Sequence, residues 1–455
     1  MSIPRLAGGL PLLGHALEFW KNPVDLLRRG RDLHGELFSF RLVGKTVHVL
    51  TEPGGNEAFF RAPDDQLSAR EAYRFTIPMF GKGVAYDVSP ELMDEQIGLI
   101  IPALRDARMQ TYVQAMEEEA EAYSDAWGEE GEFELTRAMN EMTVFNACRC
   151  LIGREFRRRL SAEFAASYHD LEAGVNLIAF FRPGWPLPAM RRRDRGRANI
   201  LRLISQVLQE RRRRPGDEDF VDTLIAARYA DGGGLTDHEI TGLLLTLIFA
   251  GQHTTAIMAS WTGILLLRHQ RYLERVRIEQ SRLDRDRPLT LAALRSLVML
   301  ERCIKEAERM YPPLVMLMRV ILRDFTYRGE TLPAGDLAMV APAVTHRLAH
   351  VFREPNRYDP DRFGPGREED RRTQFALIGF GGGKHRCIGA GFAYQHIKVL
   401  WTVLLRKFHL ELAPGDYPPD YSTFVVGPRQ PCIIRYRRRS VRAPLAVAGK
   451  ETHSL

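Results

Sequence analysis

Hydrophobic and polar residues alternate near the amino terminus in the pattern of paired strands. Phe38, Phe40 and Leu42 are separated by polar residues. A glycine at position 44 then begins a short turn, and a second run of strand-forming residues covers 46–50. Alternation with a period of two, interrupted by a turn, predicts a β-hairpin over this segment.

The middle of the chain has the spacing of helices instead. From about Pro90 to Met310 apolar residues recur at helical intervals, with interruptions near 128–131, 182–186 and 232–234. Short strands are expected again near 317–328 and 422–437. We therefore predict a mainly α fold with a small β portion. No internal repeat or long linker divides the chain, which favours one domain over residues 1–455, with 440–455 as a flexible tail.

One helix is exceptionally long and apolar. Thr236 can cap its start while Glu239 reaches back, and the pattern continues to about Arg268, a length of roughly 50 Å at 1.5 Å per residue. We expect this helix to be the central core element, so its polar island at 252–255 needs an explanation. The longest apolar run, 242–251, is shorter than the roughly 20 residues of a bilayer span. No transmembrane segment is predicted.

Composition and charge narrow the protein class. The chain has 455 residues, 45% hydrophobic and 27% charged, which is typical of a globular protein. Its formal net charge is +7, with arginine clusters at 191–197, 211–214 and 437–439. No nucleic-acid motif accompanies the clusters, so nucleic-acid binding is disfavoured and solvated helix faces are expected. Five scattered cysteines fit a reducing compartment. We expect a cytoplasmic monomer, with peripheral membrane contact as a further option.

A glycine-rich loop carries the most distinctive chemistry. Residues 380–389 read Phe-Gly-Gly-Gly-Lys-His-Arg-Cys-Ile-Gly, and a helical pattern follows over 390–405. Cys387 therefore precedes a helix amino terminus, where backbone N–H groups and the neighbouring His385 and Arg386 favour a metal-binding thiolate. A phosphate loop would need Ser or Thr after Lys384, and a zinc site would need more ligands. For the cysteine alone, a buried structural role remains the default.

The whole loop resembles the haem-binding signature of the cytochrome P450 family. Phe380, Gly383, Cys387 and Gly389 match Phe-x-x-Gly-x-x-x-Cys-x-Gly. The Glu-x-x-Arg and Pro-x-Arg-Phe motifs of the family are matched upstream at 306–309 and 360–363. The resemblance implies a P450 fold with a long helix over haem b, iron protoporphyrin IX, bound through the Cys387 thiolate. Phe380 and Gly381 would contact the cofactor, and Glu306, Arg309 and Arg362 would form a structural triad behind it.

Two segments resemble the sterol 14α-demethylases in particular. Residues 251–255 are similar to their Gly-x-His-Thr-Ser motif, with Thr255 in place of serine. Residues 73–87 resemble their Tyr-x-Phe/Leu-x-x-Pro-x-Phe-Gly segment. In an anonymous helix, the island would be a satisfied core histidine with threonines bonded to the preceding turn. The resemblance instead implies a local helix distortion at which His253 passes protons inward and Thr254 is the final donor.

The resemblance also assigns binding residues. Tyr73, Arg319 and His385 would hold the haem propionates, since charge-assisted bonds suit that role. Relatives carry a basic residue near positions 92–94, where Leu, Met and Asp stand here, so haem anchoring is expected to be rearranged. Segment 174–198 resembles a lid over the entrance. The substrate cavity would be lined by Phe75, Phe80, Leu314, Met316 and Phe424.

The implied activity is removal of a sterol 14α-methyl group by three successive oxidations, giving alcohol, aldehyde and then formate. Thiolate-bound haem with O2 inserts oxygen into C–H bonds. Electrons would come from NAD(P)H indirectly, through a ferredoxin or flavodoxin that meets a basic face near Lys384 and Arg386. One alternative keeps the chemistry and hydroxylates a terpenoid, polyketide or other specialised metabolite. A more remote alternative is a haem sensor without turnover.

Overall fold

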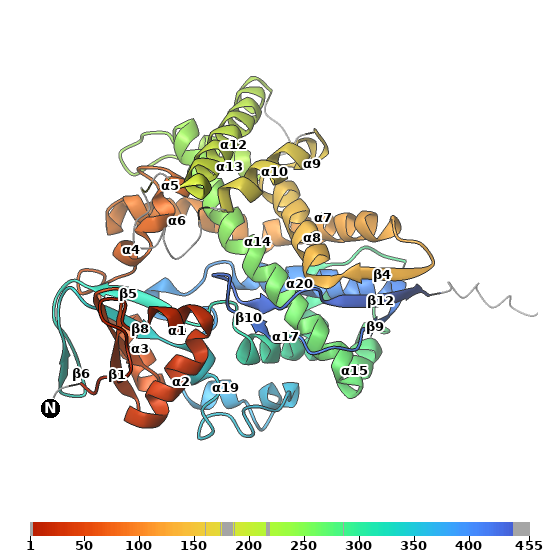
Figure 1. Cartoon of the computed structure of the whole chain (residues 1–455). Coiled ribbons are helices and arrows are strands. Elements are labelled where there is room, and N and C mark those ends of the chain that lie inside the picture. The colour runs from red at the N-terminus through yellow and green to blue at the C-terminus, as the bar shows by residue number, and fades with distance from the viewer. Residues whose placement is uncertain are drawn as a thin grey trace, which may run out of the picture.

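The computed structural model describes residues 3–159, 161–172, 174, 185, 187–214, 219–284 and 286–439. A large helical part lies beside a smaller part built on β-sheet (Figure 1). The α-helices are α1 (Ala16–Lys21), α2 (Pro23–His34), α3 (Pro53–Arg61), α4 (Ala69–Ala72), α5 (Ile77–Phe80), α6 (Pro90–Ile100), α7 (Asp106–Asp125), α8 (Leu135–Leu151), α9 (Arg154–Arg159), α10 (Ser161–Glu172), α12 (Pro188–Arg213), α13 (Phe220–Ala226), α14 (Asp237–Arg268), α15 (Gln270–Gln280), α16 (Leu291–Ser296), α17 (Val298–Met310), α18 (Pro342–Thr345), α19 (Glu369–Arg372) and α20 (Ala390–Lys407). Short 3-10 turns are η1 (Arg74–Thr76), η2 (Ala85–Asp87), η3 (Ile101–Leu104), η4 (Pro360–Phe363) and η5 (Gly383–His385).

The strands of the described residues form four small sheets. The predicted hairpin is confirmed, and it belongs to a five-stranded sheet of order β1-β2-β8-β5-β3. The strands are β1 (Leu37–Leu42), β2 (Lys45–Leu50), β3 (Leu67–Ser68), β4 (Glu130–Glu134), β5 (Leu317–Ile321), β6 (Phe325–Tyr327), β7 (Glu330–Leu332), β8 (Leu337–Val340), β9 (Phe408–Leu412), β10 (Pro419–Asp420), β11 (Gly427–Pro428) and β12 (Ile433–Arg438).

The segment around 128–131 is more than an interruption between helices. Residues 130–134 form strand β4, which pairs antiparallel with β12 near the carboxyl terminus, and β12 pairs in turn with β9. Local spacing did not indicate β4 or β9. Strands of this kind are decided by the partner that supplies their hydrogen bonds, and for β4 that partner lies hundreds of residues away along the chain.

The long central helix is confirmed as α14. Thr236 accepts a hydrogen bond from the Glu239 N–H, and the Glu239 carboxylate accepts one from the Thr236 N–H, which completes a capping box. The helix packs against α8, α17 and α20. It is the one described helix long and apolar enough to cross a membrane, but 61% of its most apolar window is buried inside the protein. Its apolar character is therefore that of a core helix.

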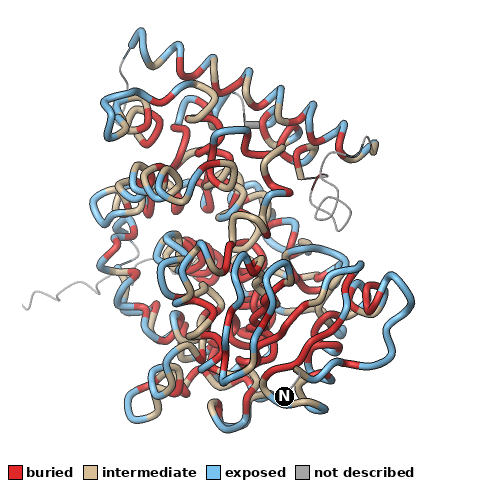
Figure 2. The backbone as a smooth tube through the Cα atoms, turned by 90° about the vertical axis from the view of Figure 1, so that its left-hand side faces the viewer, coloured by how far each residue is buried: buried red, intermediate tan, exposed pale blue. Residues whose placement is uncertain are grey.

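Tight helix contacts and a dispersed charge network complete the frame. The buried positions run through the interior of both parts, with exposed segments outside (Figure 2). At Gly263 of α14 a β-carbon would lie 2.0 Å from the Trp401 ring of α20, so glycine permits this close approach. Several clustered arginines pair with acids at the surface, as Arg192 does with Asp170. The predicted solvated role fits these side chains.

Candidate active site

The cysteine loop is a backbone cradle in front of α20. The Cys387 N–H donates to the Phe380 carbonyl at 2.9 Å, and the Gly381 N–H donates to that of Ile378 at 2.8 Å. Gly381 and Gly383 have φ angles of 69° and 58°, a left-handed conformation that favours glycine. A β-carbon at Gly383 would lie 2.6 Å from the Phe60 carbonyl oxygen. The loop therefore requires these glycines.

The sulfur of Cys387 is distinct from the other four thiols. Cys387 is exposed, whereas the other cysteines are buried. Burial of its surroundings raises the pKa of Cys387, and N–H groups of Gly389 and Ala390 and the charge of Arg386 oppose that rise. The predicted contribution of the helix amino terminus is present, but burial outweighs it. A thiol in this setting is deprotonated once a metal coordinates it.

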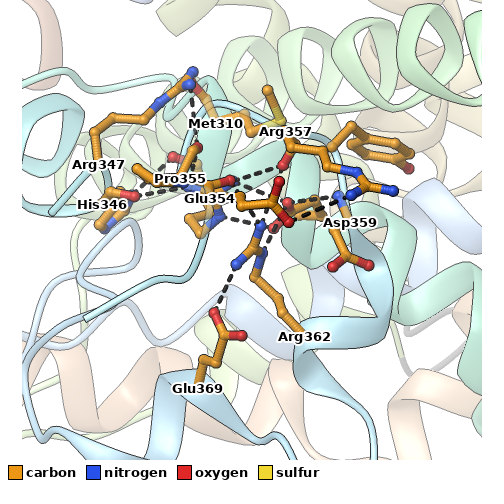
Figure 3. A network of polar contacts seen from close by, with 12 residues as sticks. Met310, His346, Arg347, Glu354, Pro355, Arg357, Asp359, Arg362 and Glu369 are labelled. Atoms are coloured by element: carbon orange, nitrogen blue, oxygen red, sulfur yellow. Dashed lines mark hydrogen bonds and ion pairs between the residues drawn. The ribbon is translucent and has the colours of Figure 1, made fainter. Parts of the chain in front are cut away.

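A buried ion network lies behind the loop, and it joins all three residues of the expected triad. Arg309 Nε and Arg362 Nε lie 2.7 and 3.0 Å from the two carboxylate oxygens of Glu306, and all three side chains have no exposed surface. Arg362 also contacts Glu369 and the carbonyls of a loop that includes Glu354 (Figure 3). Because both guanidinium groups meet several acceptors, the buried charges are paired and hydrogen-bonded.

His346 connects this network to the cysteine loop. Its Nε2 accepts a hydrogen bond from the Ile378 N–H at 2.9 Å, and its Nδ1 lies 3.3 Å from the Arg309 carbonyl. The acceptor role of Nε2 places the proton on Nδ1. Burial, aided by the charge of Arg309, lowers the pKa of His346 to about 3. The ring is therefore neutral, and it holds the loop two residues before Phe380.

A carboxyl group is buried on the same side. Glu308 accepts a hydrogen bond from the Tyr394 hydroxyl at 2.7 Å. Burial raises the pKa of Glu308 to about 7, while Tyr394 and the charges of Lys305 and Arg386 oppose the rise. Gly379 makes room for it, since a β-carbon there would lie 2.4 Å from Glu308 Oε1.

The polar island of α14 sits where the helix is least covered. The residues after the island, up to 267, are buried, but Ala250 before it is exposed, and Gly251, His253 and Thr254 are half-buried. His253 Nε2 lies 2.5 Å from Glu172 Oε1 of α10. Thr254 Oγ1 donates to the Ala250 carbonyl at 2.7 Å. The helix continues through these residues without a break, and the threonine bond to the preceding turn is the one expected of an ordinary helix.

Gln252 and Thr255 face another way. Gln252 Nε2 donates to Asn140 Oδ1 of α8 at 3.1 Å, and Thr255, three residues later, shares that helix face. Thr255 is buried, and its hydroxyl has no hydrogen-bond partner in the part of the chain that the structure describes. The extra methyl group relative to serine is therefore buried inside the protein.

Tyr73 and Arg319, which were expected to contact the haem, lie on one side of the loop together with Tyr86. Tyr73 stacks on Tyr86 with ring centroids 5.3 Å apart. Burial raises the pKa of both phenols, and the charge of Cys387 adds to the rise for Tyr86. Arg319 of β5 is buried, donates to the Phe59 carbonyl at 2.8 Å, and has a pKa lowered by burial to about 10, with Asp64 and Tyr73 opposing.

Carboxylates occupy the region where a base was expected. His385 Nε2 lies 2.5 Å from Asp64 Oδ1, and Lys384 Nζ lies 3.1 Å from the other oxygen of Asp64. Lys384 also pairs with Asp94 at 2.9 Å. Asp94 is one of the three residues found in place of the usual basic residue. The chain therefore supplies a base to this region from the cysteine loop, and that base is held by two acids.

The residues expected to line the substrate cavity make two separate aromatic contacts, and they do not form one continuous surface. The Phe75 ring packs edge to face on Phe424 at 5.9 Å, and the Phe80 ring packs on Phe249 of α14 at 5.7 Å. Phe424 is exposed, whereas Phe75 and Phe80 are buried. Met316, which is half-buried like Leu314, packs against the core beneath the five-stranded sheet.

Part of the expected lid 174–198 lies outside the described residues, which omit 175–184 and 186. Its described end begins at α12, and Trp185 is exposed. Arg197 of α12 donates to the carbonyls of Met79 and Phe80, at 3.1 and 3.2 Å. This arginine ties α12 to the aromatic segment around Phe80.

Comparison with known proteins shows the family to which the chain belongs. A model of the family "Cytochrome P450" matches residues 4–434, which is most of the chain. The chain belongs to the cytochrome P450 family. The solved structure "Retinoic acid bound cyanobacterial CYP120A1" matches this P450 with a TM-score of 0.86 at 24% identity, covering 96% of this chain and 100% of that one. The predicted P450 fold is confirmed.

Curated relatives of this P450 share nearly its whole length. A sterol 14-demethylase of Arabidopsis thaliana is 39% identical, covering 96% of this chain and 92% of the plant protein. A sterol 14alpha-demethylase of Mycobacterium tuberculosis is 38% identical, with 97% and 99% covered. A lanosterol 14-alpha demethylase of Rattus norvegicus is 38% identical, with 96% and 88% covered. The resemblance to P450s of the sterol demethylase type is confirmed.

The residues of this P450 fit the haem that its family uses with O2 and an electron-donating partner. No group of three or more His, Cys, Asp or Glu that could hold a metal occurs among the described residues. A lone thiolate suits a metal that brings its other ligands in a macrocycle. Cys387, which is exposed, would ligate the haem iron, and the glycine cradle and the uncovered centre of α14 would leave room for the macrocycle, with Arg319 and Tyr73 nearby.

Several residues of this site escaped the sequence reasoning. They are Glu172, Asp64, Tyr86, Arg197 and Glu308. Each either contacts a residue from a distant segment of the chain or lies inside a motif without having been given a role of its own. Glu308 and Tyr86 were within quoted motifs, but only their burial and contacts distinguish them. Glu172 and Asp64 carry no local signal in a single sequence.

Proposed function

We propose that this P450 is a sterol 14α-demethylase that removes the 14α-methyl group by three successive oxidations, through alcohol and aldehyde to formate. The observation that carries the proposal is that relatives of this name, from a plant, a bacterium and a mammal, match at least 96% of the chain at 38–39% identity. When bound, thiolate-ligated haem b would supply the oxygen-inserting chemistry. The protein supplies protons, an apolar cavity and orientation.

His253 and Glu172 are the proposed proton entrance. The 2.5 Å contact between Nε2 and the carboxylate holds the imidazole toward α10, and the Glu172 side chain is 19% exposed. Protons can therefore enter from solvent through Glu172 and pass to His253. Thr254 is the next hydroxyl along the helix. Its proton rests on the Ala250 carbonyl, so the hydroxyl must rotate to donate elsewhere.

The substrate would lie against the aromatic segment 73–87. Phe75 and Phe80 present apolar rings, Arg197 fixes the backbone of this segment, and Phe424 adds an exposed ring from the last part of the chain. Leu314 and Met316 remain candidates for the same cavity. An apolar cavity with few polar groups suits a sterol, whose recognition depends on shape and burial.

The proposal also includes the electron supply: electrons would come from NAD(P)H through a ferredoxin or flavodoxin. The protein would act as a monomer in the cytoplasm. Arg386 is exposed beside the cysteine loop. Lys384, by contrast, is engaged by Asp64 and Asp94. Docking through a basic face should weaken as salt is added. Reduction rates with each donor that do not fall with salt would contradict this part.

The first experiment is a titration of the haem-loaded protein with 14α-methyl sterols while the Soret band is recorded. A shift to high spin is expected, because a bound sterol displaces water from the iron. Formate and demethylated sterol should then appear when a reductase, a ferredoxin and O2 are added. If carbon monoxide gives the band of a thiolate-ligated haem but no sterol shifts the spectrum, the demethylase proposal fails.

A second function is favoured by one observation. Leu92, Met93 and Asp94 stand in the region where relatives carry a basic residue, and a different cofactor environment is expected from this. Hydroxylation of a terpenoid, polyketide or other specialised metabolite is the function to test if sterols do not bind. The same spectral titration with such compounds separates the two.

Replacement of Thr254 tests its proposed donor role. Thr254→Ala should leave sterol binding intact but uncouple O2 consumption from product, since the last proton would not be delivered. Thr255→Ala is the matched control, because Thr255 shares the face of Gln252 toward α8. The ratio of product to O2 consumed is the measurement. Equal ratios in the Thr254 variant and the parent would contradict the role.

A further inference from the structure

A cavity that contains two arginines lies between helix α2, the end of α17, the short helix α18 and the segment from β10 to β11. Its volume is about 200 Å³. One side is an apolar wall, which is also a small hydrophobic cluster of its own, and it consists of Val24, Val315, Ala343 and Val426. The polar groups of the lining are Arg28, Tyr311, Arg347 and Tyr421. We call this space the arginine cavity.

The arginine cavity is separate from the proposed active site. Its lining includes none of the residues expected to contact haem or substrate. The two sites nevertheless share chain segments, because Val315 lies between Leu314 and Met316, which are candidates for the substrate cavity. The Val426 N–H donates to the Pro313 carbonyl at 2.9 Å and so joins the two segments that form the apolar wall. A ligand here would bind apart from the sterol.

Arg347 has hydrogen-bond donors to spare. Its Nη1 donates to the Pro355 carbonyl and to Asn356 Oδ1, at 3.4 and 2.9 Å. Its Nη2 donates to the Met310 carbonyl at 2.7 Å (Figure 3). A guanidinium group has five N–H donors, and these contacts use three of them. The Nε–H and one Nη2–H have no partner among the described residues.

The charge of Arg347 also lacks a counter-charge. Its three acceptors are neutral, and no carboxylate of the described residues forms an ion pair with it. Burial, aided by the like charges of Arg309 and Arg28, lowers the pKa of Arg347 to about 10, while Tyr311 and Glu306 oppose the change. Charges removed from water in a protein are normally paired. An anion in the cavity would supply the missing charge.

Two further groups of the lining can bind an anion. Arg28 is 55% exposed, and its acid partner Asp25, itself 66% exposed, lies 3.5 Å away. Such an exposed pair is weak, so the guanidinium is available to another anion. The Tyr421 hydroxyl has no hydrogen-bond partner among the described residues. Burial raises the pKa of Tyr421, so its hydroxyl keeps the proton that it would donate.

We propose that the arginine cavity binds a small organic acid. Its carboxylate would lie among Arg28, Arg347 and Tyr421, and its apolar body would pack against the valines of the wall. The volume equals that of about seven water molecules in the liquid, which suits an acid of about the size of benzoate and is far too small for a sterol. An inorganic anion would leave the apolar wall wet. This inference does not depend on the proposed substrate.

The test is calorimetric titration of the haem-loaded protein with benzoate, and with benzamide as a neutral molecule of the same shape. Benzoate should bind with a Kd of about 1 mM or lower, and benzamide should bind about tenfold more weakly. Tyr421→Phe and Arg28→Gln should each weaken benzoate binding about two- to fivefold. Ala343→Leu should abolish it, because the larger side chain would fill the apolar part of the cavity.

The matched controls are Arg29→Gln and Tyr327→Phe, since these residues pair with Glu18 and Glu36 outside the cavity. Both should bind benzoate like the parent, and unchanged Soret and circular dichroism spectra establish that each variant is folded. A phenylimidazole bound to the iron should leave the benzoate affinity unchanged. Benzoate binding that this ligand blocks would place the acid in the haem cavity and overturn the proposal. So would equal affinities for benzoate and benzamide, or for the parent and the three cavity variants.

Discussion

At the scale of single residues, the site depends on pairs between side chains that are far apart in the chain. Glu172 contacts His253, and Asp64 joins Lys384 and His385 of the cysteine loop. Although burial opposes it, the hydrogen bonds and charges of His385 and Lys384 hold the pKa of Asp64 below its usual range. These pairs place an acid beside His253, Lys384 and His385.

The proposed role of Glu172 leads to a prediction for Glu172→Gln. The amide keeps the size of the carboxylate but carries no proton to His253, so product formation should slow about 100-fold, as for loss of a general acid or base. The solvent isotope effect should rise at the same time. Glu163→Gln is the control, because Glu163 lies on the same helix and pairs with Arg202 at the surface. Parent-like rates and isotope effects would remove Glu172 from the relay.

Asp94 provides a second residue-scale prediction. Both members of the Asp94–Lys384 pair are more than half exposed, so the pair itself contributes little to stability. If the base acts on the cofactor, Asp94→Asn should leave Lys384 held by Asp64 alone and slow haem transfer to apomyoglobin about two- to fivefold. Asp65→Asn serves as the control, because Asp65 is a surface partner of Arg323. Faster haem loss in the Asp94 variant would contradict the idea.

At the scale of elements, α14 has two different tasks along its length. Its carboxyl-terminal half is buried and crosses α20 closely at Gly263, where it meets Trp401. Its middle is open at Ala250 and Gly251, where the proposed chemistry takes place. The same helix thus packs in the protein core at its carboxyl-terminal end and forms a wall of the proposed active site in its middle.

This division predicts opposite effects for two glycine replacements. Gly263→Ala should lower the free energy of unfolding by about 1–3 kcal/mol, because its β-carbon would lie 2.0 Å from Trp401. Gly251→Ala should raise it by up to about 1 kcal/mol, since nothing lies within 4 Å and alanine favours the helix. Urea unfolding of both variants is the measurement. A stabilised Gly263 variant would show that α14 and α20 can separate without loss.

At the scale of the whole molecule, buried ionisable groups link stability to pH. His346 and Glu308 lie on the side of the cysteine loop that faces the ion network. Lowering the pH below about 6.5 disfavours the fold through His346, because the unfolded chain takes up a proton that the buried ring resists. Glu308 has the opposite effect on stability: because burial raises its pKa, it favours the fold at low pH and disfavours the fold as the pH rises.

Glu308→Gln removes the ionisable carboxyl and therefore isolates the contribution of Glu308 to the pH dependence of stability. The folded pKa of Glu308 is about 7, above the unfolded value near 4.5, so its contribution is intact below pH 4.5 and is lost as pH rises to about 7. At pH 8 the variant should be more stable than the parent by about 3 kcal/mol, and the difference should vanish near pH 4.5. Urea unfolding across this range measures it.

The control for this pH series is Glu274→Gln, a change at an exposed glutamate. Its stability should follow that of the parent at every pH. A Glu308 variant whose advantage does not change with pH would show that the effect is one of packing, and that ionisation of the buried carboxyl is not involved.

The sequence by itself determined the features that local chemistry dictates. The hairpin, the capped start of α14 and the glycine cradle around Cys387 each follow from residues within a few positions of one another, because turns, caps and alternation are short-range effects. The motifs also named the members of the Glu306, Arg309 and Arg362 network. Together with the resemblance to the P450 family, these features were enough to predict the fold class, and they made Cys387 the proposed haem ligand.

Only the tertiary structure decided which distant groups meet. Strand β4 exists because β12 pairs with it, and Glu172 matters because α10 packs beside the middle of α14. Lys384 and Asp64 are 320 residues apart in sequence. The arginine cavity likewise emerged only when the packing of α2, α18 and the β10–β11 segment was known. Such contacts depend on the packing of whole elements, and a single sequence carries no local trace of that packing.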